Sequence, residues 1–520
     1  MRKHTILIFT TLILFMATSS PAQQEETTLS LTLEDCIVKA LRQNLGVAIE
    51  LMNPDVAELR VSQAKEIFYP TLTFGYNTRE NIQASYSFLE AGGDVQSTRS
   101  GFDAEISQLL PIGGTFSIAL DGYSTETNQR FQSVNPRYGA TLRFDLRQPL
   151  LRNFGAKITK REIIVARNNL DISETQLERS LQQTIYNVEQ AYWSLKGLIE
   201  NLKVRQLSLQ LAEELLEKNK RSVEVGTLAP IEILSSQSAV ASRKADIIQA
   251  ESQIRDAEDS LRILLNLSAE GIEDDVRIIP LDTPDFEKRE ISFEDAFQTA
   301  LQKRPDLNGT RINLKNREID VKNAKNQLLP GLNLSASYWS PGQSGTEIIY
   351  DPSDPFGPPI GENEHPPSDA VSDAFNFVYD NWSVALTLDI PLNNILSKAN
   401  YAQTKVNMEQ SLLMLKDQEQ QIFLEIKSAV RAVQTNYERV QAYEVAMDLA
   451  EETLIAEEEK FKVGISTPYF VLQYQTELTT AQTNLLIAKY DYVLSLASLE
   501  RSLGTSLEKR NIKYSDFQGK

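Results

Sequence analysis

The sequence predicts an α+β membrane protein built from two internal repeats, each of which joins amphipathic strands to a long helical hairpin. Three observations lead to this fold class. The chain begins with an export signal, one plan of sequence occurs twice along it, and in each copy the apolar residues recur first at every second position and then at every seventh. Alternation is typical of strands, and a sustained seven-residue step is typical of helices that supercoil against a partner.

The first residues have the composition of a secretory signal peptide. Arg2 and Lys3 are followed by an apolar run at 6–16, and the small residues Ser20 and Ala22 form a cleavage site. We expect a signal peptide at 1–22, because the apolar run is too short for the alternative, a membrane anchor. Loss of Arg2 and Lys3 would change the formal charge from −19 to −21, and so acidic a chain is not expected to bind nucleic acid.

No later segment has the roughly 18 consecutive apolar residues of a membrane-spanning helix. If the mature chain crosses a membrane, it must do so as a closed β-barrel, since every backbone polar group has to be paired inside the lipid. The only cysteine, Cys36, leaves no intrachain disulfide and no thiolate metal cluster to be formed.

One plan of sequence occurs twice. Residues 31–44 (LTLEDCIVKALRQN) match residues 291–304 (ISFEDAFQTALQKR) at an offset of 260, and further along the offset becomes 238. The first half therefore holds 22 extra residues after Pro70. Such a repeat indicates duplication of a structural unit. We expect a first repeat at 23–268, a linker at 269–290, a second repeat at 291–505 and a tail at 506–520.

Each half contains a long helix and a returning helix. The first long helix is predicted from about Lys157 to Val225, which at 1.5 Å per residue is roughly 100 Å. Helix-ending glycines and helix-starting prolines place the two tips, near 226 and near 464. The apolar residues that keep the seven-residue step are Leu181, Val188, Leu195, Leu202, Leu209, Leu216 and Val223 in the first long helix, and Val471, Leu478, Leu485, Tyr492 and Leu499 in the second returning helix.

The strand regions alternate in both halves. In the first half, Leu142, Phe144 and Leu146 lie on one face and the charged residues between them on the other. A half-buried strand in a soluble sandwich shows the same alternation, but the strand length and the export signal favour a membrane barrel whose apolar face meets lipid. The stretch 341–370, rich in Pro, Gly and Asp, is predicted to be an exposed loop between two strands.

The extra residues of the first half have the pattern of a β-hairpin. Two alternating runs between Phe102 and Ser124 flank a Pro111–Gly114 turn. We expect this hairpin to add two strands, so that the first half supplies four and the second half two, with its turn at the end of the sheet where the helices begin. The alternative is a hairpin that folds over the outer mouth as a loop.

Catalysis is not expected. The chain has only two histidines, His4 in the signal and His365 in the predicted loop, so no histidine-paired nucleophile and no metal cluster can be assembled. The many carboxylates lie between the seven-residue positions, where a solvated helix face is the ordinary explanation. We therefore expect no enzyme activity, no metal and no cofactor.

The doubled arrangement of parts resembles the TolC-like outer membrane efflux protein family. The segments that carry the resemblance are both tips with the hairpins behind them and two strand ends, namely EVGTLAPIEILSSQSAV at 224–240, KVGISTPYFVLQYQTELTTAQTNLLIAKYDYVLSLASLERSLGT at 462–505, RFDLRQPLLRNFG at 143–155 and ALTLDIPLNN at 385–394. The resemblance covers nearly all of the mature chain, and its strength lies in the doubled order at matched offsets.

The resemblance implies a fold in which a shared transmembrane β-barrel is continued by a long antiparallel α-helical coiled-coil barrel. It implies a homotrimer in the outer membrane that extends into the periplasm, where a periplasmic adaptor protein couples it to an inner-membrane pump. The function it implies is the passive exit duct of a tripartite efflux or type I secretion system for small molecules or proteins. A structural coiled-coil protein or adhesin of the cell envelope is the alternative, but such a stalk needs no amphipathic strands.

The resemblance also carries over candidate site residues. Acidic residues just past the tips ring the tunnel entrance in the family, and the matching positions here are Glu232, Ser235, Phe470 and Gln473. Only Glu232 keeps the acid, and it is equally explained as a first-turn residue that the helix dipole favours. The adaptor-docking residues would be Val225, Gly226, Thr227, Val463, Gly464 and Ile465, and the barrel lumen would be lined by Arg143, Asp145, Arg147 and Asp389.

Overall fold

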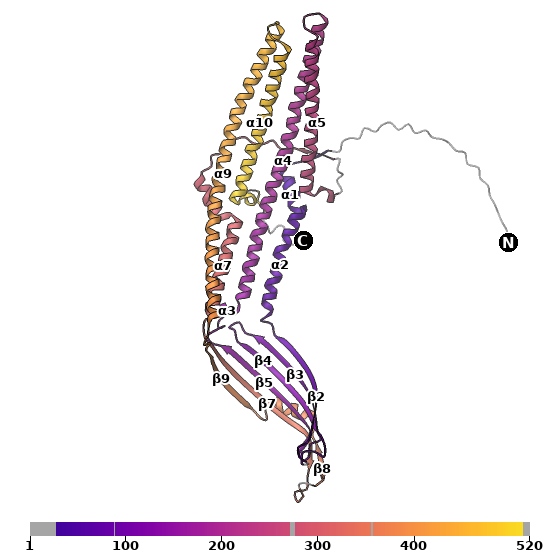
Figure 1. Ribbon diagram of the computed structural model, residues 1–520, viewed down its shortest axis with the longest axis vertical. Helices are drawn as coiled ribbons and strands as arrows, with labels where there is room; N and C mark the ends of the chain where they lie inside the picture. Colours follow the sequence, from indigo (N-terminus) through magenta and orange to yellow (C-terminus); the bar gives the residue numbers. More distant parts are fainter. Residues whose placement is uncertain (1–27, 88, 271–275, 355–356, 513–520) are drawn as a thin grey trace, which may run out of the picture. The chain divides into compact units, whose positions relative to one another are not determined.

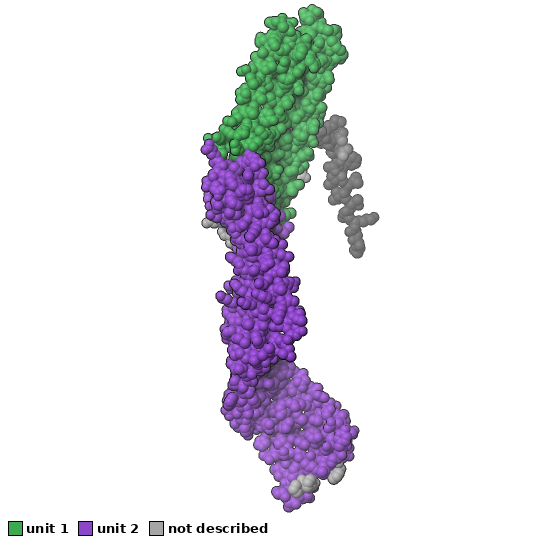
Figure 2. All heavy atoms as spheres, turned by 60° about the vertical axis from the view of Figure 1, so that its left-hand side comes forward, with its two compact units in different colours: residues 1–45, 184–289, 432–497 green, residues 46–183, 290–431, 498–520 purple. Residues whose placement is uncertain are grey.

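The computed structural model describes residues 28–87, 89–270, 276–354 and 357–512 (Figure 1). The predicted signal peptide at 1–22 lies outside these residues. The chain forms two compact units, coloured green and purple in Figure 2. Unit 1 contains residues 1–45, 184–289 and 432–497, and unit 2 contains residues 46–183, 290–431 and 498–520.

The two halves of the chain have helices at the offsets that the sequence shows. At the offset of 260 the matching helices are α1 (Leu33–Gln43) with α6 (Phe293–Lys303) and α2 (Leu45–Glu66) with α7 (Pro305–Asn326). At the offset of 238 they are α4 (Arg161–Glu224) with α9 (Ile395–Lys462) and α5 (Ile231–Leu265) with α10 (Pro468–Leu503). The short helices are α3 (Ala156–Thr159), η1 (Leu267–Glu270), α8 (Pro367–Phe375) and α11 (Ser506–Lys509).

The acidic pair that recurs near the start of each half has a local structural role. The Asp35 N–H donates to Thr32 Oγ1 at 3.1 Å, and the Asp35 carboxylate accepts from the Thr32 N–H at 3.2 Å, which closes a capping box at the start of α1. The Thr32 hydrogen bonds lower the pKa of Asp35. In the second half the Asp295 N–H donates to Ser292 Oγ at 3.4 Å at the start of α6.

Unit 1 is held together by the residues of the seven-residue step. The four of these residues in α10 that belong to unit 1 are buried, and so are Val188 and Leu195 of α4. The predicted helical seam is therefore confirmed at these positions, whereas Leu202, Leu209, Leu216 and Val223 of α4 are half-buried. Unit 1 also contains a short parallel pair, β1 (Thr28–Leu31) with β6 (Arg277–Pro280), and β6 lies inside the segment 269–290 that was predicted to be only a linker. Burial raises the pKa of the nearby Cys36 thiol to about 12, which makes this cysteine unreactive.

Unit 2 contains an antiparallel sheet in the order β2-β3-β4-β5-β7, with β8 and β9 both paired to β7. Four strands come from the first half and two long strands from the second, which confirms the predicted numbers; the short β8 is additional. The strands are β2 (Thr71–Gln83), β3 (Val95–Leu109), β4 (Thr115–Thr127), β5 (Val134–Pro149), β7 (Gly331–Ile349), β8 (Gly361–Glu364) and β9 (Asn381–Asp389).

The strand register gives the sheet two faces of different character. We call one the apolar face, which carries Phe74, Ile106, Leu120, Leu142, Phe144, Leu146, Trp382, Val384 and Leu386. We call the other the polar face, which carries Asp103, Asp121, Arg143, Asp145, Arg147, Ser337 and Asp389. Directly paired residues point to the same side of a sheet, so the alternation seen in single strands extends across the whole sheet.

The extra hairpin of the first half adds β3 and β4 to the sheet, as predicted, and does not fold over the outer mouth. Its turn lies beside the start of the helices, where the Gly155 N–H donates to the Ile112 carbonyl at 3.0 Å. Gly113 in this turn has φ +96°, and a Cβ there would come 2.4 Å from the Asn153 carbonyl oxygen, so only glycine fits. We call this end of the sheet the helix end and the opposite end the loop end.

The stretch 341–370 was wrongly predicted to be one exposed loop. Its beginning continues β7, and its later part contains β8 and the start of α8. Helix α8 packs Ala370 and Ala374 onto Ala140 and Leu142 of the apolar face. Leu142, which was expected to meet lipid, is therefore only 6% exposed, whereas Leu146 is 37% exposed.

Candidate functional site

Each helical hairpin turns through a short connection that we call a tip. The first tip, 225–230, follows α4, and the second, 463–467, follows α9. At the first tip Gly226 has φ +78°, its N–H donates to the Val223 carbonyl at 3.0 Å, and the Thr227 N–H donates to the Ser222 carbonyl at 2.9 Å. This is a Schellman ending, in which the left-handed residue is almost always glycine.

The second tip has the same backbone. Gly464 has φ +79°, its N–H donates to the Phe461 carbonyl at 3.1 Å, and the Ile465 N–H donates to the Lys460 carbonyl at 3.0 Å. The turn exposes the side chains beside each glycine, because a left-handed residue directs the chain away from the helix just ended. All six residues predicted to dock an adaptor are exposed, and Val225 and Ile465 are 75% and 79% exposed although they are apolar.

The two tips are stabilised from behind by different polar side chains. At the first tip the buried Asn219 Nδ2 donates to Ser236 Oγ at 2.8 Å, which links α4 to α5. At the second tip Glu457 stands at the position of Asn219 and accepts from Ser466 and from Lys460 Nζ, the latter at 2.9 Å. These two hydrogen bonds lower the pKa of Glu457, so this carboxylate stays charged under mildly acidic conditions.

The two hairpins pack against each other below the tips. Leu215 of α4 belongs to one apolar cluster with Leu454 of α9 and Val471 of α10. Arg243 of α5 is buried, and its guanidinium donates at 3.0 Å both to the Ser208 carbonyl and to Gln475 Oε1. Four helices are thus tied together immediately behind the tips, so the exposed tip residues stand on a rigid support.

The predicted entrance residues lie in the first turns of the returning helices. Glu232 and Ser235 of α5 are half-buried, whereas Phe470 and Gln473 of α10 are exposed. The ring of Phe470 meets that of Tyr469 nearly edge-on, with centroids 5.6 Å apart, and Gln473 Nε2 donates to Glu477 Oε1 at 2.9 Å. Within the described part of the chain, no hydrogen bond or ion pair joins the Glu232 turn to the Phe470 turn.

The four residues predicted to line a lumen all lie on the polar face of the sheet. Arg143 bonds Asp121 at 2.7 Å and approaches Asp145 at 3.5 Å, and Ser337 Oγ donates to Asp145 at 2.6 Å. Asp121 and Ser337 were not predicted as lumen residues, although the alternation of their strands places them on this face. Charges on the polar face near Arg143 are therefore largely compensated.

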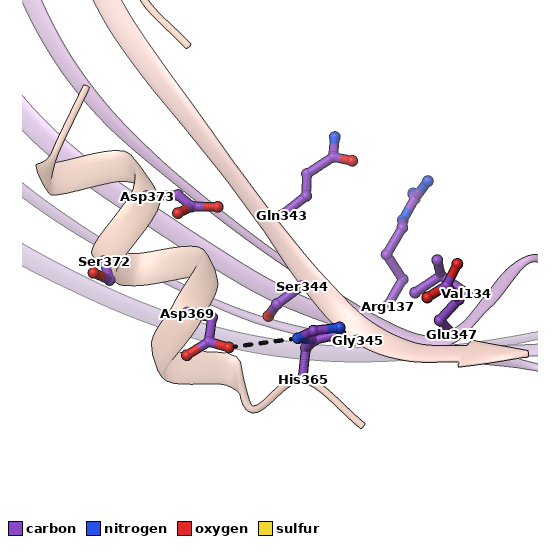
Figure 3. Close-up of a pocket in the computed structure, with 10 residues that line it drawn as sticks. All are labelled: Val134, Arg137, Gln343, Ser344, Gly345, Glu347, His365, Asp369, Ser372 and Asp373. Carbon is purple, nitrogen blue, oxygen red and sulfur yellow. Dashed lines mark ion pairs between the residues drawn. The ribbon is translucent and has the colours of Figure 1, made fainter. Parts of the chain in front are cut away.

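An open cavity of about 490 Å³ lies between α8 and the outer part of β7 (Figure 3). His365 Nδ1 stands 3.8 Å from Asp369 Oδ2 on its rim, and Asn363 Nδ2 is 3.1 Å from His365 Nε2. Among the described residues, no three His, Cys, Asp or Glu side chains are placed to hold a metal ion. None of the described helices is both long enough and apolar enough to cross a membrane.

Comparison with known proteins gives consistent matches. The model of the outer membrane efflux protein family matches residues 144–267 and 296–505. Outer membrane protein TolC of Vibrio cholerae is 22% identical over 345 residues, which are 65% of this chain and 71% of that protein. Alkaline protease secretion protein AprF of Pseudomonas aeruginosa is 23% identical over 333 residues, which are 63% of each chain.

Solved structures share the fold at low identity. The outer-membrane channel OprN matches with a TM-score of 0.64 at 15% identity, covering 91% of this chain and 90% of its own. The CmeC outer membrane channel of Campylobacter jejuni matches with a TM-score of 0.61 at 15% identity, covering 98% of this chain and 99% of its own. These likenesses extend over both the strand region and the helical hairpins.

Proposed function

The chain belongs to the outer membrane efflux protein family, and from this premise we propose that three copies of it assemble around one axis into a closed duct. The protein is an exit duct for efflux or secretion, located in the outer membrane and extending into the periplasm. In the proposed assembly the sheets of the three copies close one transmembrane barrel, the helical hairpins form a periplasmic tunnel, and cargo passes through chemically unchanged.

The open edges of the sheet carry this proposal. Among the described strands, β2 and β9 each pair on one side only. Within the chain, β5, the last strand of the first half, pairs with β7, the first strand of the second half. The equivalent pair would be β9, the last strand of the second half, with β2, the first strand of the first half. That pair can form only between two copies, and β2 and β9 run in the opposite directions that antiparallel pairing needs.

An unpartnered helix face supports the same arrangement. The apolar residues Ile49, Met52 and Val56 of α2 follow heptad spacing, yet each is more than 45% exposed. The positions of α7 that match them at the offset of 260 are Gly309, Ile312 and Asn316, all buried. Helix α7 packs on α4, the long helix of the other half, as the 2.7 Å hydrogen bond from Asn168 to Asn316 shows. The equivalent partner of α2 is α9 of a neighbouring copy.

The tips are proposed to dock a periplasmic adaptor protein that leads to an inner-membrane pump. Both tips present an apolar residue directly beside the glycine, Val225 and Ile465, on a rigid support. Contiguous apolar patches with a polar rim are typical of protein interaction sites, and at the second tip the exposed Val463 and Ile465 flank Gly464. The two tips have the same backbone, so one adaptor motif can bind both.

The tunnel entrance is proposed to lie at Glu232, Ser235, Phe470 and Gln473. Only Glu232 of these four carries a charge, and Phe470 is exposed with its ring against Tyr469. A constriction with one acidic position and one aromatic position from each chain would favour cations weakly and present an apolar wall to passing cargo. Catalysis has no place in this function.

The proposed function is tested by purification in detergent, mass measurement by light scattering, and single-channel recording in planar bilayers. We expect a trimer that conducts ions, and we expect Glu232→Gln to lower the cation preference, because three acids near one axis raise the local cation concentration. A monodisperse, water-soluble monomer obtained without residues 1–22 would contradict the duct. A conducting trimer whose ion preference is unchanged in Glu232→Gln would return Glu232 to a role in helix initiation alone.

A further inference from the structure

Three arginines lie in one row across the polar face near the loop end of the sheet. Arg79 of β2 is directly opposite Arg99 of β3, Arg99 is opposite Thr125 of β4, and Thr125 is opposite Arg137 of β5. Directly paired residues project to the same side, so the three guanidinium groups share the polar face. All three side chains are exposed. We call this set the arginine row.

The arginine row has no acidic partner. No carboxylate of the described chain forms an ion pair with Arg79, Arg99 or Arg137, whereas Arg143, further toward the helix end, has one with Asp121 at 2.7 Å. Arg79 and Arg99 are directly opposite each other, and like charges in this arrangement destabilise a sheet. The row is a cluster of positive charge in a chain whose formal net charge is −19. Arg137 also lines the open cavity that includes Glu347, Asp369 and Asp373, but it forms no ion pair with them. An arginine cluster without a paired carboxylate is available to bind an anion from outside the chain.

A tyrosine positions two members of the row. The ring of Tyr123 lies 4.1 Å from the Arg99 guanidinium carbon and 5.7 Å from that of Arg137. The ring occupies the space above Gly139, where a Cβ would come 2.5 Å from it. Two cations over one aromatic ring are held in a preferred orientation by the ring's negative face. Figure 3 shows the Arg137 side chain pointing away from α8 and from the His365–Asp369 pair.

The opposite face of the sheet is not cationic at this level. One row of residues adjacent to the arginine row projects to this opposite face and is uncharged. It consists of Thr78, Ser100 and Ser124, which pair with one another. The positive charge is therefore confined to the polar face, which in the proposed duct faces the lumen. An anion that meets the row comes from the conduction path and not from the surrounding lipid.

We propose that the arginine row binds the anionic groups of small cargo molecules, such as carboxylates, phosphates or sulfates, as they leave the duct. The proposal rests on the duct function and adds a preference to it. Guanidinium groups bind carboxylate and phosphate oxygens in pairs of parallel hydrogen bonds, and arginines that line a pore select anions. With three copies, three such rows surround the outer part of the lumen and counteract the repulsion of anions by the rest of the chain.

The test uses the full-length trimer in planar bilayers, with inorganic tripolyphosphate as the probe, added in turn to each side. At 0.1 M KCl we expect tripolyphosphate to block the wild-type channel from the loop-end side. In the combined variant Arg79→Gln, Arg99→Gln, Arg137→Gln, at least a tenfold higher concentration should be needed. Raising KCl to 1 M should weaken the wild-type block strongly, because the Debye length falls from about 10 Å to about 3 Å.

Two controls keep the outcomes separate. Glu126→Gln changes one charge on the opposite face of β4 and should leave the block unchanged, and Arg99→Lys combined with Arg137→Lys should retain part of it because the charge remains. A wild-type protein that conducts no ions would overturn both the duct and this inference. Suppose instead that the wild type conducts ions and that both proteins form trimers of normal mass. Equal block of the wild type and the triple glutamine variant by tripolyphosphate would then overturn the inference alone.

Discussion

At the residue scale, single side chains explain why particular positions recur in the two halves. Gly226 and Gly464 could be predicted from the sequence as helix-ending residues, and their positive φ angles confirm it. The side chains that stabilise the tips could not be predicted. Asn219 and Glu457 occupy equivalent positions but bind different partners, because each partner depends on how the connection after the helix folds back. Sequence spacing carries no information about that fold-back.

Asp306 should make the stability of unit 2 depend on acid pH. Burial raises its pKa, but the hydrogen bonds and charge of Arg304, 2.7 Å away, outweigh burial and leave the pKa below its ordinary value. A carboxylate with a lowered folded pKa contributes stability above its unfolded pKa, near 3.9, and loses that contribution as pH falls through the folded value. We expect Asp306→Asn to cost about 2 kcal/mol at pH 7 and to remove this part of the acid dependence.

The measurement is the apparent melting temperature of the helical circular dichroism signal in detergent between pH 2 and pH 8. The matched control is Asp417→Asn, which changes an exposed carboxylate of α9. The two variants should differ most at pH 7 and converge at low pH. This role would be ruled out if the difference in melting temperature between Asp306→Asn and the wild type were the same at every pH.

At the element scale, the regular elements followed from the sequence and the irregular connection did not. The β3–β4 hairpin was predicted because two alternating runs flank a compact turn. Helix α8 was missed because its sequence is short and lies within a Pro-, Gly- and Asp-rich stretch. Helix α8 is stabilised because its Ala370 and Ala374 pack against β5. Such a long-range contact cannot be recognised from local composition.

Gly342 should be required for α8 to dock on the sheet. A Cβ at this position would lie 1.9 Å from the Ala370 carbonyl oxygen and 2.8 Å from the Ala374 nitrogen, both backbone atoms that cannot move independently. We expect Gly342→Ala to displace α8 and to speed protease cleavage between β8 and β9 at least several-fold, because docking protects that connection. Gly361→Ala is the control, since its Cβ would make ordinary contacts at 3.7 Å. Equal cleavage rates in both variants would contradict the docking role.

At the scale of the whole molecule, the repeat predicts how copies meet. The Leu150 N–H donates to the Leu332 carbonyl at 2.7 Å where β5 ends beside β7. In the second half, Leu392 corresponds to Leu150, because each follows the last strand of its half. In the first half, Leu72 corresponds to Leu332 at the offset of 260. Carrying this register over to β9 and β2 of neighbouring copies places Thr387 opposite Asn77, both on the polar face.

A disulfide between copies tests this register. We expect Asn77→Cys combined with Thr387→Cys to give a covalent trimer on mild oxidation, since opposed residues in a sheet lie within disulfide reach. Asn77→Cys combined with Ser383→Cys places the thiols four residues apart along the strand, roughly 13 Å, and should stay monomeric on a denaturing gel. The native Cys36 is fully buried and should not interfere. Equal cross-linking of the two cysteine pairs would refute the register. An absence of cross-linking in both pairs would argue against the β2–β9 contact.

The open edge of β2 has a further consequence for how the protein is made. In a newly exported single chain, β2 pairs with β3 along one edge and leaves its other edge open over thirteen residues beside an apolar face. An open strand edge of this kind promotes strand-to-strand aggregation. In the proposed trimer that edge is closed by neighbouring copies, so we expect the yield of correctly assembled protein to depend on how quickly the copies associate. We therefore expect unassembled chains to be kept from aggregating by chaperone binding or to be removed by proteolysis.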